Sequence, residues 1–152
     1  MIYLDHAAST PMHPEAVAAM LPLLTGHFGN PSGVHAVSRI AKDYLEGARE
    51  QVAVAIGAKP KEIVFTGGGT EANALGILGL AQIQSSLGHV ITTQIEHPAV
   101  KQACLSLEGQ GHRVTFLKPD RYGQIHTEQV AEAISGDTFL VTVMLGNNEI
   151  GT

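Results

Sequence analysis

The chain has 152 residues, of which 44% are hydrophobic and 15% charged, and its formal net charge at pH 7 is −5. A chain of this size and balance folds around a sizeable core, which excludes a disordered protein. The acidic balance, without a lysine or arginine cluster, argues against a nucleic-acid-binding surface.

Three further features of the composition bear on location and metal binding. The single Cys104 excludes an internal disulfide and suits a reducing compartment. No apolar run approaches the length of a membrane span, and the N-terminus has no charged-then-apolar signal. The eight histidines show no metal-ligand spacing. We therefore expect a cytoplasmic protein without a membrane partner and without a metal site.

The N-terminal quarter predicts an arm, a helix and a loop. Residues 1–13 form a short strand or an extended arm, and we treat them as a segment separate from residues 14–152. Pro14 is well placed in the first turn of a helix that runs to about Leu24. Pro22 lies inside that pattern and is expected to kink the helix or end it early. Residues 26–33 are rich in turn formers and predict a loop.

The middle of the chain predicts two helices joined by a strand and a glycine turn. One apolar stripe predicts a long helix over residues 34–56, with Gly57 as its C-cap. β-Branched and aromatic residues at 62–66 predict a short strand, which three glycines end. Apolar residues at three-to-four spacing over residues 70–87 then predict a helix.

The C-terminal half alternates strands with helices. The predicted elements are strand 89–93, helix 98–108, strand 114–117, turn 120–123, helix 127–134 and strand 138–144. This alternation predicts an α/β fold with a mainly parallel sheet and helices on both faces. In such sheets, ligands bind outside the carboxyl ends of the strands. Residues 67–70, His97 and the pair Asn147-Asn148 all fall at that edge.

The glycine turn at residues 67–69 leaves three interpretations open. It is a tight connection that needs positive φ, or a dinucleotide-binding turn in which Gly67, Gly69 and Ala72 match the Rossmann fingerprint. Alternatively, it is a cup for the phosphate of a smaller cofactor, because a helix N-terminus favours an anion and glycine allows close approach. A Walker loop is excluded, because the Gly-Lys-Ser/Thr sequence is absent.

Two side chains, His97 and Asn148, have both a structural and a functional interpretation, whereas Glu71 and Cys104 have a structural one. His97 is a capping or surface histidine, or it stacks on a cofactor ring and takes part in proton transfer. Asn148 is a turn former, or it donates to a phenolate-like oxygen. Glu71 would repel a phosphate, so we assign it a structural role and expect it to point away. Cys104 lies in an apolar helical pattern and is predicted to be buried and unreactive.

Five segments resemble successive motifs of one enzyme family. Their order matches that of cysteine desulfurases in the class V aminotransferase group, which are pyridoxal-phosphate enzymes of fold type I. The segments are residues 3–11, 28–32, 63–71, 96–100 and 147–151. The resemblance covers the whole chain but only the N-terminal portion of a usual family member. It displaces the dinucleotide interpretation and implies that residues 14–152 are an incomplete large domain.

The resemblance implies roles for four residues. Backbone and hydroxyl groups of Gly69 and Thr70 would hold the phosphate of pyridoxal 5′-phosphate (PLP), His97 would stack on its ring, and Asn148 would hydrogen-bond its 3′-oxygen. The family releases alanine from L-cysteine and transfers the sulfur to an enzyme thiolate as a persulfide. It also implies a homodimer and a sulfur-acceptor or scaffold protein as partners.

Two positions depart from the family pattern. Members usually carry asparagine three residues after the glutamate of the phosphate motif, where this chain has Ala74, with Asn73 one place earlier. We expect a local hydrogen bond to be lost or rerouted. Members also often carry glycine where Ser38 stands, which we expect to be tolerated.

The family's remaining catalytic groups match nothing in this chain. The Schiff-base lysine, the aspartate that pairs with the pyridine nitrogen and the acceptor cysteine would lie beyond the position that matches Thr152, and Cys104 is not at the acceptor position. We therefore expect the chain alone to be inactive. In fold type I, the strand at 62–66 would also lack neighbours here, which implies a fragment, a completing chain or a rearrangement. The alternatives are a non-catalytic binding or assembly module and another class V enzyme, such as a selenocysteine lyase or an aminotransferase.

Overall fold

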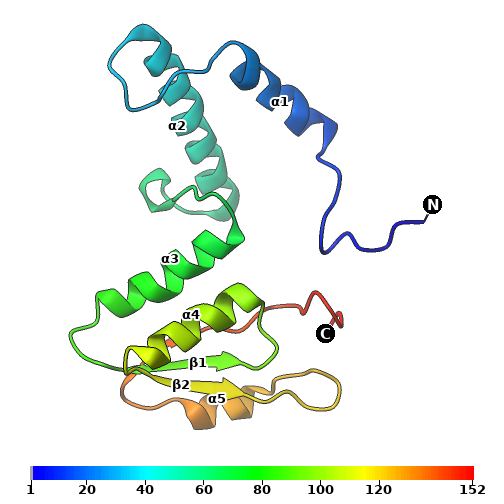
Figure 1. Ribbon diagram of the computed structural model, residues 1–152, viewed down its shortest axis with the longest axis vertical. Coiled ribbons are helices and arrows are strands. Elements are labelled where there is room, and N and C mark those ends of the chain that lie inside the picture. The colour runs from blue at the N-terminus through cyan, green and yellow to red at the C-terminus, as the bar shows by residue number, and fades with distance from the viewer. Residues whose placement is uncertain (1) are drawn as a thin grey trace. The chain divides into compact units, whose positions relative to one another are not determined.

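The computed structural model describes residues 2–152, and the colours of Figure 1 follow its helices and strands from the N-terminus to the C-terminus. Contacts divide the chain into two compact units, one ending at Phe65 and the other beginning at Thr66. The first unit holds α1 (Pro14–Thr25), α2 (Ala36–Ile56) and the short 3-10 helix η1 (Pro60–Glu62). The second holds α3 (Gly69–Gln82), β1 (His89–Thr93), α4 (Pro98–Gly109), β2 (Arg113–Leu117), α5 (Thr127–Ala133) and β3 (Thr138–Val141).

Helix α1 begins at the predicted proline but does not end at Pro22. It continues to Thr25, where the N–H groups of Gly26 and His27 both donate to the Pro22 carbonyl at 2.9 Å. A proline in a helix removes one backbone donor. Because no residue of α1 is buried, the acceptor left without that donor faces water, and the expected early end is wrong.

Helix α2 has defined caps at both ends. His35 is its N-cap, and Nδ1 of His35 accepts from the Ser38 N–H at 3.4 Å. Gly57 ends the helix with φ of 70°, which confirms the predicted glycine C-cap. Only Ser38, Ala41 and Ala53 of this helix are buried, so the unit ending at Phe65 has little core of its own.

The strand predicted over residues 62–66 is wrong. Pro60–Glu62 form η1, and residues 63–66 are outside any helix or strand. The Ile63 carbonyl accepts from Nη1 of Arg49 at 2.6 Å, and the same guanidinium lies 5.1 Å from the centre of the Phe65 ring. A strand needs a neighbour to pair its backbone groups, and here an arginine side chain of α2 takes that place.

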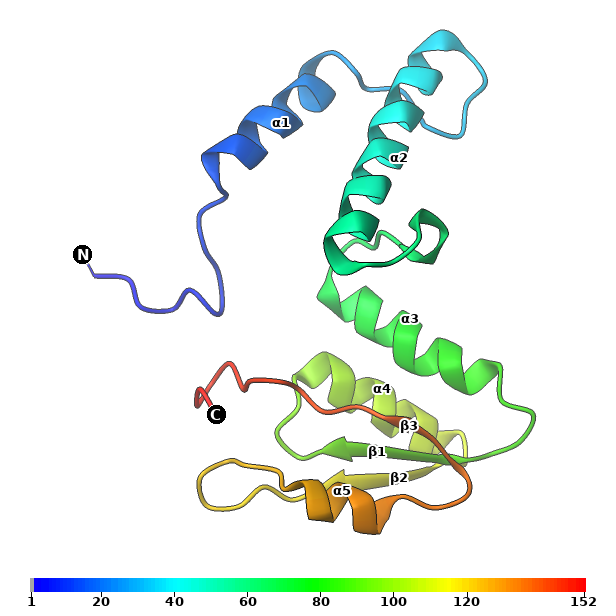
Figure 2. The ribbon, with the colours of Figure 1, turned by 180° about the vertical axis from the view of Figure 1, so that it is seen from behind.

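The second unit is organised around a parallel sheet with the order β2-β1-β3. Figure 2 shows the three strands with α4 and α5 beside them. All five residues of the central strand β1 are buried, as a parallel strand with cover on both faces requires. The prediction of an α/β fold with a parallel sheet and flanking helices is confirmed.

The core of this unit lies between the sheet and the helices α3 and α4. Its buried members are Ile77, Ala81, Val90, Val100, Ala103, Cys104 and Leu107. Burial raises the pKa of the Cys104 thiol, and the nearby Glu96 carboxylate acts in the same direction. Cys104 is therefore a packing residue, as predicted.

Two elements of this unit are shorter than predicted. Helix α3 ends at Gln82 instead of residue 87, in front of a serine pair whose side chains compete with helical hydrogen bonds. Strand β3 ends at Val141 instead of residue 144. The Thr142 N–H still donates to the Ile91 carbonyl at 2.9 Å, but the Met144 N–H donates to the side chain of Glu96. The chain therefore leaves the sheet where a side chain replaces a strand as acceptor.

Candidate cofactor site

The glycine turn leads into the N-terminus of α3 without needing glycine for its backbone shape. None of residues 67–69 is in the left-handed region, and Gly68 has an extended φ of 163°. A Cβ atom on Gly68 or Gly69 would meet nothing within 4 Å. The positive-φ interpretation therefore fails, and the glycines leave open space before a helix start that no side chain caps. Such a helix start favours an anion.

Glu71 has the structural role that the sequence predicts. Its Oε2 atom accepts from the Gly67 N–H at 2.6 Å, so the carboxylate turns back onto the loop before the helix. The Thr66 hydroxyl donates to the Gly68 carbonyl at 3.1 Å. These two bonds hold the loop in shape.

His97 is the N-cap of α4, directly after the turn that follows β1. Its Nδ1 atom accepts from the Ala99 N–H at 3.1 Å, so Nδ1 carries no proton in this arrangement. In the neutral ring the proton is then on Nε2. The side chain is exposed, and the cap leaves Nε2 as the ring atom able to bind a ligand or exchange a proton.

Thr70 and His97, which are 27 positions apart, line one cavity of about 490 Å³. Helix α3 contributes Thr70, Ala74 and Leu78, which follow one another at helical spacing. The other lining residues are His97, Pro98, Ala99, Gln102, Ala103 and Ser106 of the α4 segment. The first turns of α3 and α4 therefore meet at this cavity, as do the positive ends of their dipoles. Ala74 adds an apolar surface there.

Asn148 is not among the residues that line this cavity. It is exposed, and its Nδ2 atom donates to Oε1 of Glu149 at 2.8 Å. Its neighbour Asn147 is buried, and Nδ2 of Asn147 donates to the Ile95 carbonyl at 2.9 Å. The segment that carries Asn148 is thus attached to the turn that carries His97.

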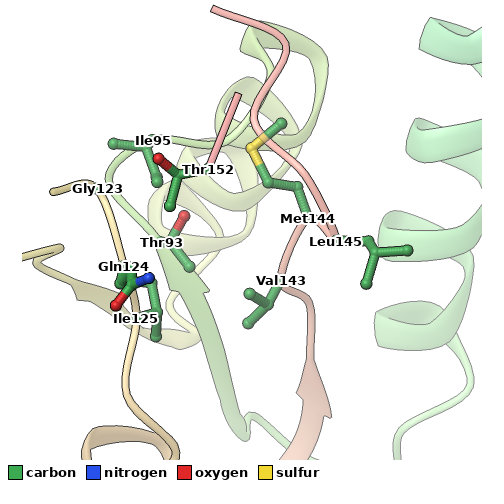
Figure 3. Close-up of a pocket in the computed structure, with 9 residues that line it drawn as sticks. All are labelled: Thr93, Ile95, Gly123, Gln124, Ile125, Val143, Met144, Leu145 and Thr152. Atoms are coloured by element: carbon green, nitrogen blue, oxygen red, sulfur yellow. The ribbon is translucent and has the colours of Figure 1, made fainter. Parts of the chain in front are cut away.

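A second cavity, of about 280 Å³, opens at the carboxyl ends of the strands. Figure 3 shows Thr93 and Ile95 at the end of β1, and Val143, Met144 and Leu145 on the segment after β3. The remaining lining residues are Gly123, Gln124, Ile125 and Thr152. The expectation that ligand space lies beyond the carboxyl ends of the strands agrees with this geometry.

Sequence reasoning assigned no role to Glu96 and placed Asn147 at this edge only as the neighbour of Asn148, although both side chains are buried. Charged and amide side chains are seldom buried, so the sequence pattern favoured their neighbours His97 and Asn148 as candidates. The signal available in the sequence was their position, since each comes three residues after a predicted strand and both strands end at the same edge.

Comparisons with known proteins agree with this geometry. The profile of the family described as "Aminotransferase class-V" matches residues 2–152. The "Putative cysteine desulfurase IscS 1" of Bacillus subtilis (strain 168) is 50% identical over 152 residues, which are 99% of this chain and 40% of that protein. The chain therefore spans about two fifths of the length of such curated relatives, and it corresponds to their N-terminal part.

Two solved structures extend the likeness to the backbone. The structure titled "NIFS-LIKE PROTEIN" superposes with a TM-score of 0.93 at 33% identity, over 99% of this chain and 42% of the other. The structure titled "SspA in complex with cysteine" superposes with a TM-score of 0.89 at 44% identity, over 97% of this chain and 43% of the other.

The chain belongs to the class V aminotransferase family, and its relatives within that family are cysteine desulfurases. Enzymes of this group depend on PLP. The residues of this chain fit PLP. The glycine turn leaves room for a phosphate at an uncapped helix start, and His97 lines the same cavity as Thr70. In the part of the chain that the structure describes, no helix is long and apolar enough to cross a bilayer.

Proposed function

We propose that this chain is the cofactor-binding portion of a PLP-dependent cysteine desulfurase. Such an enzyme converts L-cysteine to L-alanine and transfers the sulfur to an enzyme thiolate as a persulfide. The observation that carries the proposal is the cavity shared by Thr70 and His97. The cysteine bound to the similar protein SspA supports the choice of substrate.

Each proposed binding residue has a separate task. The backbone N–H groups of Gly69 and Thr70, with the Thr70 hydroxyl, would bind the cofactor phosphate at the positive end of α3. The ring of His97 would stack on the pyridine ring. The amide of Asn148 would donate to the 3′-oxygen, which requires its Nδ2 atom to exchange the present bond to Glu149 for one to the ligand.

The protein's own contribution to the chemistry centres on Nε2 of His97. PLP, when bound, supplies an electron sink for bonds at the substrate α-carbon. Because the Ala99 N–H occupies Nδ1, the imidazole exchanges protons through Nε2. The α4 cap also fixes the plane of the ring, so that stacking needs little reorganisation.

We propose further that residues 1–152 alone do not turn over cysteine. No lysine lines either of the two cavities described above. Cys104 is fully buried, and its raised pKa disfavours the thiolate that sulfur transfer needs. A homodimer, a cytoplasmic location and a sulfur-acceptor or scaffold protein of iron–sulfur cluster assembly complete the proposal.

Two histidines with the same capping role allow a matched test. His13 caps α1 as His97 caps α4, with Nδ1 accepting from the N–H two residues later, at 3.4 Å. We expect His97→Ala to weaken PLP binding, measured by absorbance titration, about three- to tenfold, because an aromatic contact is lost. We expect His13→Ala to leave PLP binding unchanged.

The same preparations decide between catalysis and a binding role. PLP binding by the protein, with alanine released from L-cysteine when the family's remaining groups are present, supports the proposal. Equal PLP affinity of His97→Ala and the unmodified protein would falsify the role of His97. A protein that binds no PLP but binds a sulfur-transfer partner would support the non-catalytic alternative.

A further inference from the structure

Glu96 is a buried carboxylate between the end of β1 and the segment that follows β3. It is 8% exposed, and its Oε1 atom accepts two hydrogen bonds. One comes from the hydroxyl of Thr93, itself fully buried, at 2.9 Å. The other comes from the Met144 N–H, also at 2.9 Å. A single oxygen atom therefore joins two segments that are 48 positions apart in the sequence.

A second bond joins the same two segments. Nδ2 of Asn147 donates to the Ile95 carbonyl at 2.9 Å. The Oδ1 atom of Asn147 accepts from the N–H groups of Glu149 and Ile150, at 2.9 and 3.1 Å. The backbone that follows Asn148 is thus held by a side chain that is itself attached beside Glu96.

Beyond the end of the sheet, these hydrogen bonds replace the backbone pairing between β1 and β3. The Thr142 N–H makes the last strand-like bond, to the Ile91 carbonyl, and two residues later the Met144 N–H bonds to Glu96 instead. Figure 3 shows Met144 on this segment, facing the end of β1 at Thr93 and Ile95. His97 follows Glu96 directly, so one turn anchored by that carboxylate carries the cap of α4.

We propose that Glu96 is a positioning residue that sets the place of His97 relative to the segment carrying Asn148, and so prepares both side chains for the pyridine ring. This role rests on the proposed function. Removal of the carboxylate leaves a buried hydroxyl and a backbone N–H without an acceptor, which the segment relieves by moving or by admitting water. Binding groups held by such bonds lose affinity when they shift by about an ångström.

The variants Glu96→Ala and Glu96→Gln separate position from stability. The alanine variant loses both hydrogen bonds, whereas the glutamine variant keeps an oxygen in the place of Oε1. The matched control is Thr138→Val in β3, beside the amino end of β1, which removes the 2.8 Å bond between Thr138 Oγ1 and His89 Nδ1. Three quantities are measured for each variant: PLP affinity with the absorbance maximum of the bound cofactor, the ring resonances of His97 by NMR without PLP, and the urea midpoint.

We expect Glu96→Ala to bind PLP about tenfold more weakly, to change the absorbance maximum and to shift the His97 ring resonances. Glu96→Gln should restore the PLP affinity, the absorbance maximum and the His97 ring resonances toward those of the unmodified protein. Thr138→Val should lower the urea midpoint and leave PLP affinity and the His97 resonances unchanged.

The inference is overturned if Glu96→Ala behaves as Thr138→Val does, with a lower urea midpoint, unchanged His97 resonances and unchanged PLP affinity. Failure of the proposed function looks different, because the unmodified protein then binds no PLP. In that case the His97 resonances decide whether Glu96 orients that ring. Unmoved resonances in Glu96→Ala reject the orientation of His97, and moved ones retain it.

Discussion

The two ends of strand β1 carry polar networks of opposite character. At the amino end, the fully buried His89 hydrogen-bonds with Thr115 Oγ1 through Nε2 and with Thr138 Oγ1 through Nδ1, both at 2.8 Å. These bonds join all three strands. At the carboxyl end, Glu96 joins β1 to the segment after β3, and the next residue, His97, faces a cavity.

The difference lies in where the hydrogen bonds end. Both nitrogens of His89 are used within the sheet, and an Arg113–Asp137 ion pair of 2.8 Å lies beside them. At the carboxyl end, the bonds of Glu96 hold the backbone, while Nε2 of His97 and the start of α3 stay available. One end of the sheet therefore stabilises the fold, and we propose that the other holds binding groups in place.

The largest expected effect comes from truncating Ile91, which is fully buried in β1 between the two polar networks. Ile91→Ala should lower the free energy of unfolding by about 2–5 kcal/mol, since it leaves a cavity in the central strand. The control is Val141→Ala, because Val141 pairs with Ile91 in register but is 41% exposed. Urea unfolding measures the free energy of unfolding of both variants. Equal losses of stability would show that the core of this unit is not centred on β1.

A glycine at each end should respond in opposite ways. Gly111, before β2, has φ of 98°, and a Cβ atom there would lie 3.2 Å from Cδ1 of Leu87. Gly111→Ala should therefore lower the free energy of unfolding by about 1–2 kcal/mol. Gly69→Ala should preserve or slightly raise stability, since alanine favours a helix and the Cβ has room, but it should weaken PLP binding. Thermal unfolding and PLP titration test the pair, and a Gly69→Ala variant with unchanged PLP affinity would contradict the proposed phosphate position.

The smallest expected effect is a pH dependence that belongs to the amino end. Burial, and secondarily Arg113, lowers the pKa of His89 below its usual value of 6.5, against the opposing charge of Asp137. The unfolded chain therefore takes up this proton first. The contribution to stability is complete above about pH 6.5 and is lost as pH falls below it, by at most about 1.4 kcal/mol per pH unit.

His89→Gln isolates this contribution. Urea unfolding of the variant between pH 7.5 and 5.5 should show a shallower loss of stability than the unmodified protein. Contributions to the pH dependence that the two proteins share cancel in the difference. Identical slopes would mean that His89 does not resist protonation in the fold.

Sequence patterns predicted most elements of the second unit because its signals are local. The run of β-branched residues at 90–93 and the proline at the start of α4 needed no tertiary information. The rule that ligands bind at the carboxyl ends of parallel strands selected His97, and the family resemblance selected Thr70. The structure places both on one cavity. Asn148 was selected by the same rule, but the structure uses the neighbouring Asn147 as the buried anchor.

The errors share a cause, which is that neighbours decide what a local pattern becomes. Residues 63–66 have strand composition but pair with Arg49 instead of a strand. Pro22 lies in a helix whose exposed surface tolerates a missing donor. Strand β3 stops where Glu96 offers an acceptor.

The amino-acid sequence by itself determined the periodicity of the helices, the parallel α/β class and the chemical kinds of the binding groups, because these follow from short-range backbone preferences and side-chain chemistry. Only the tertiary structure decided that Glu96 and Asn147 are the joints between two distant segments. A hydrogen bond depends on where two groups lie to within a fraction of an ångström, and packing alone brings residues 48 positions apart to that separation.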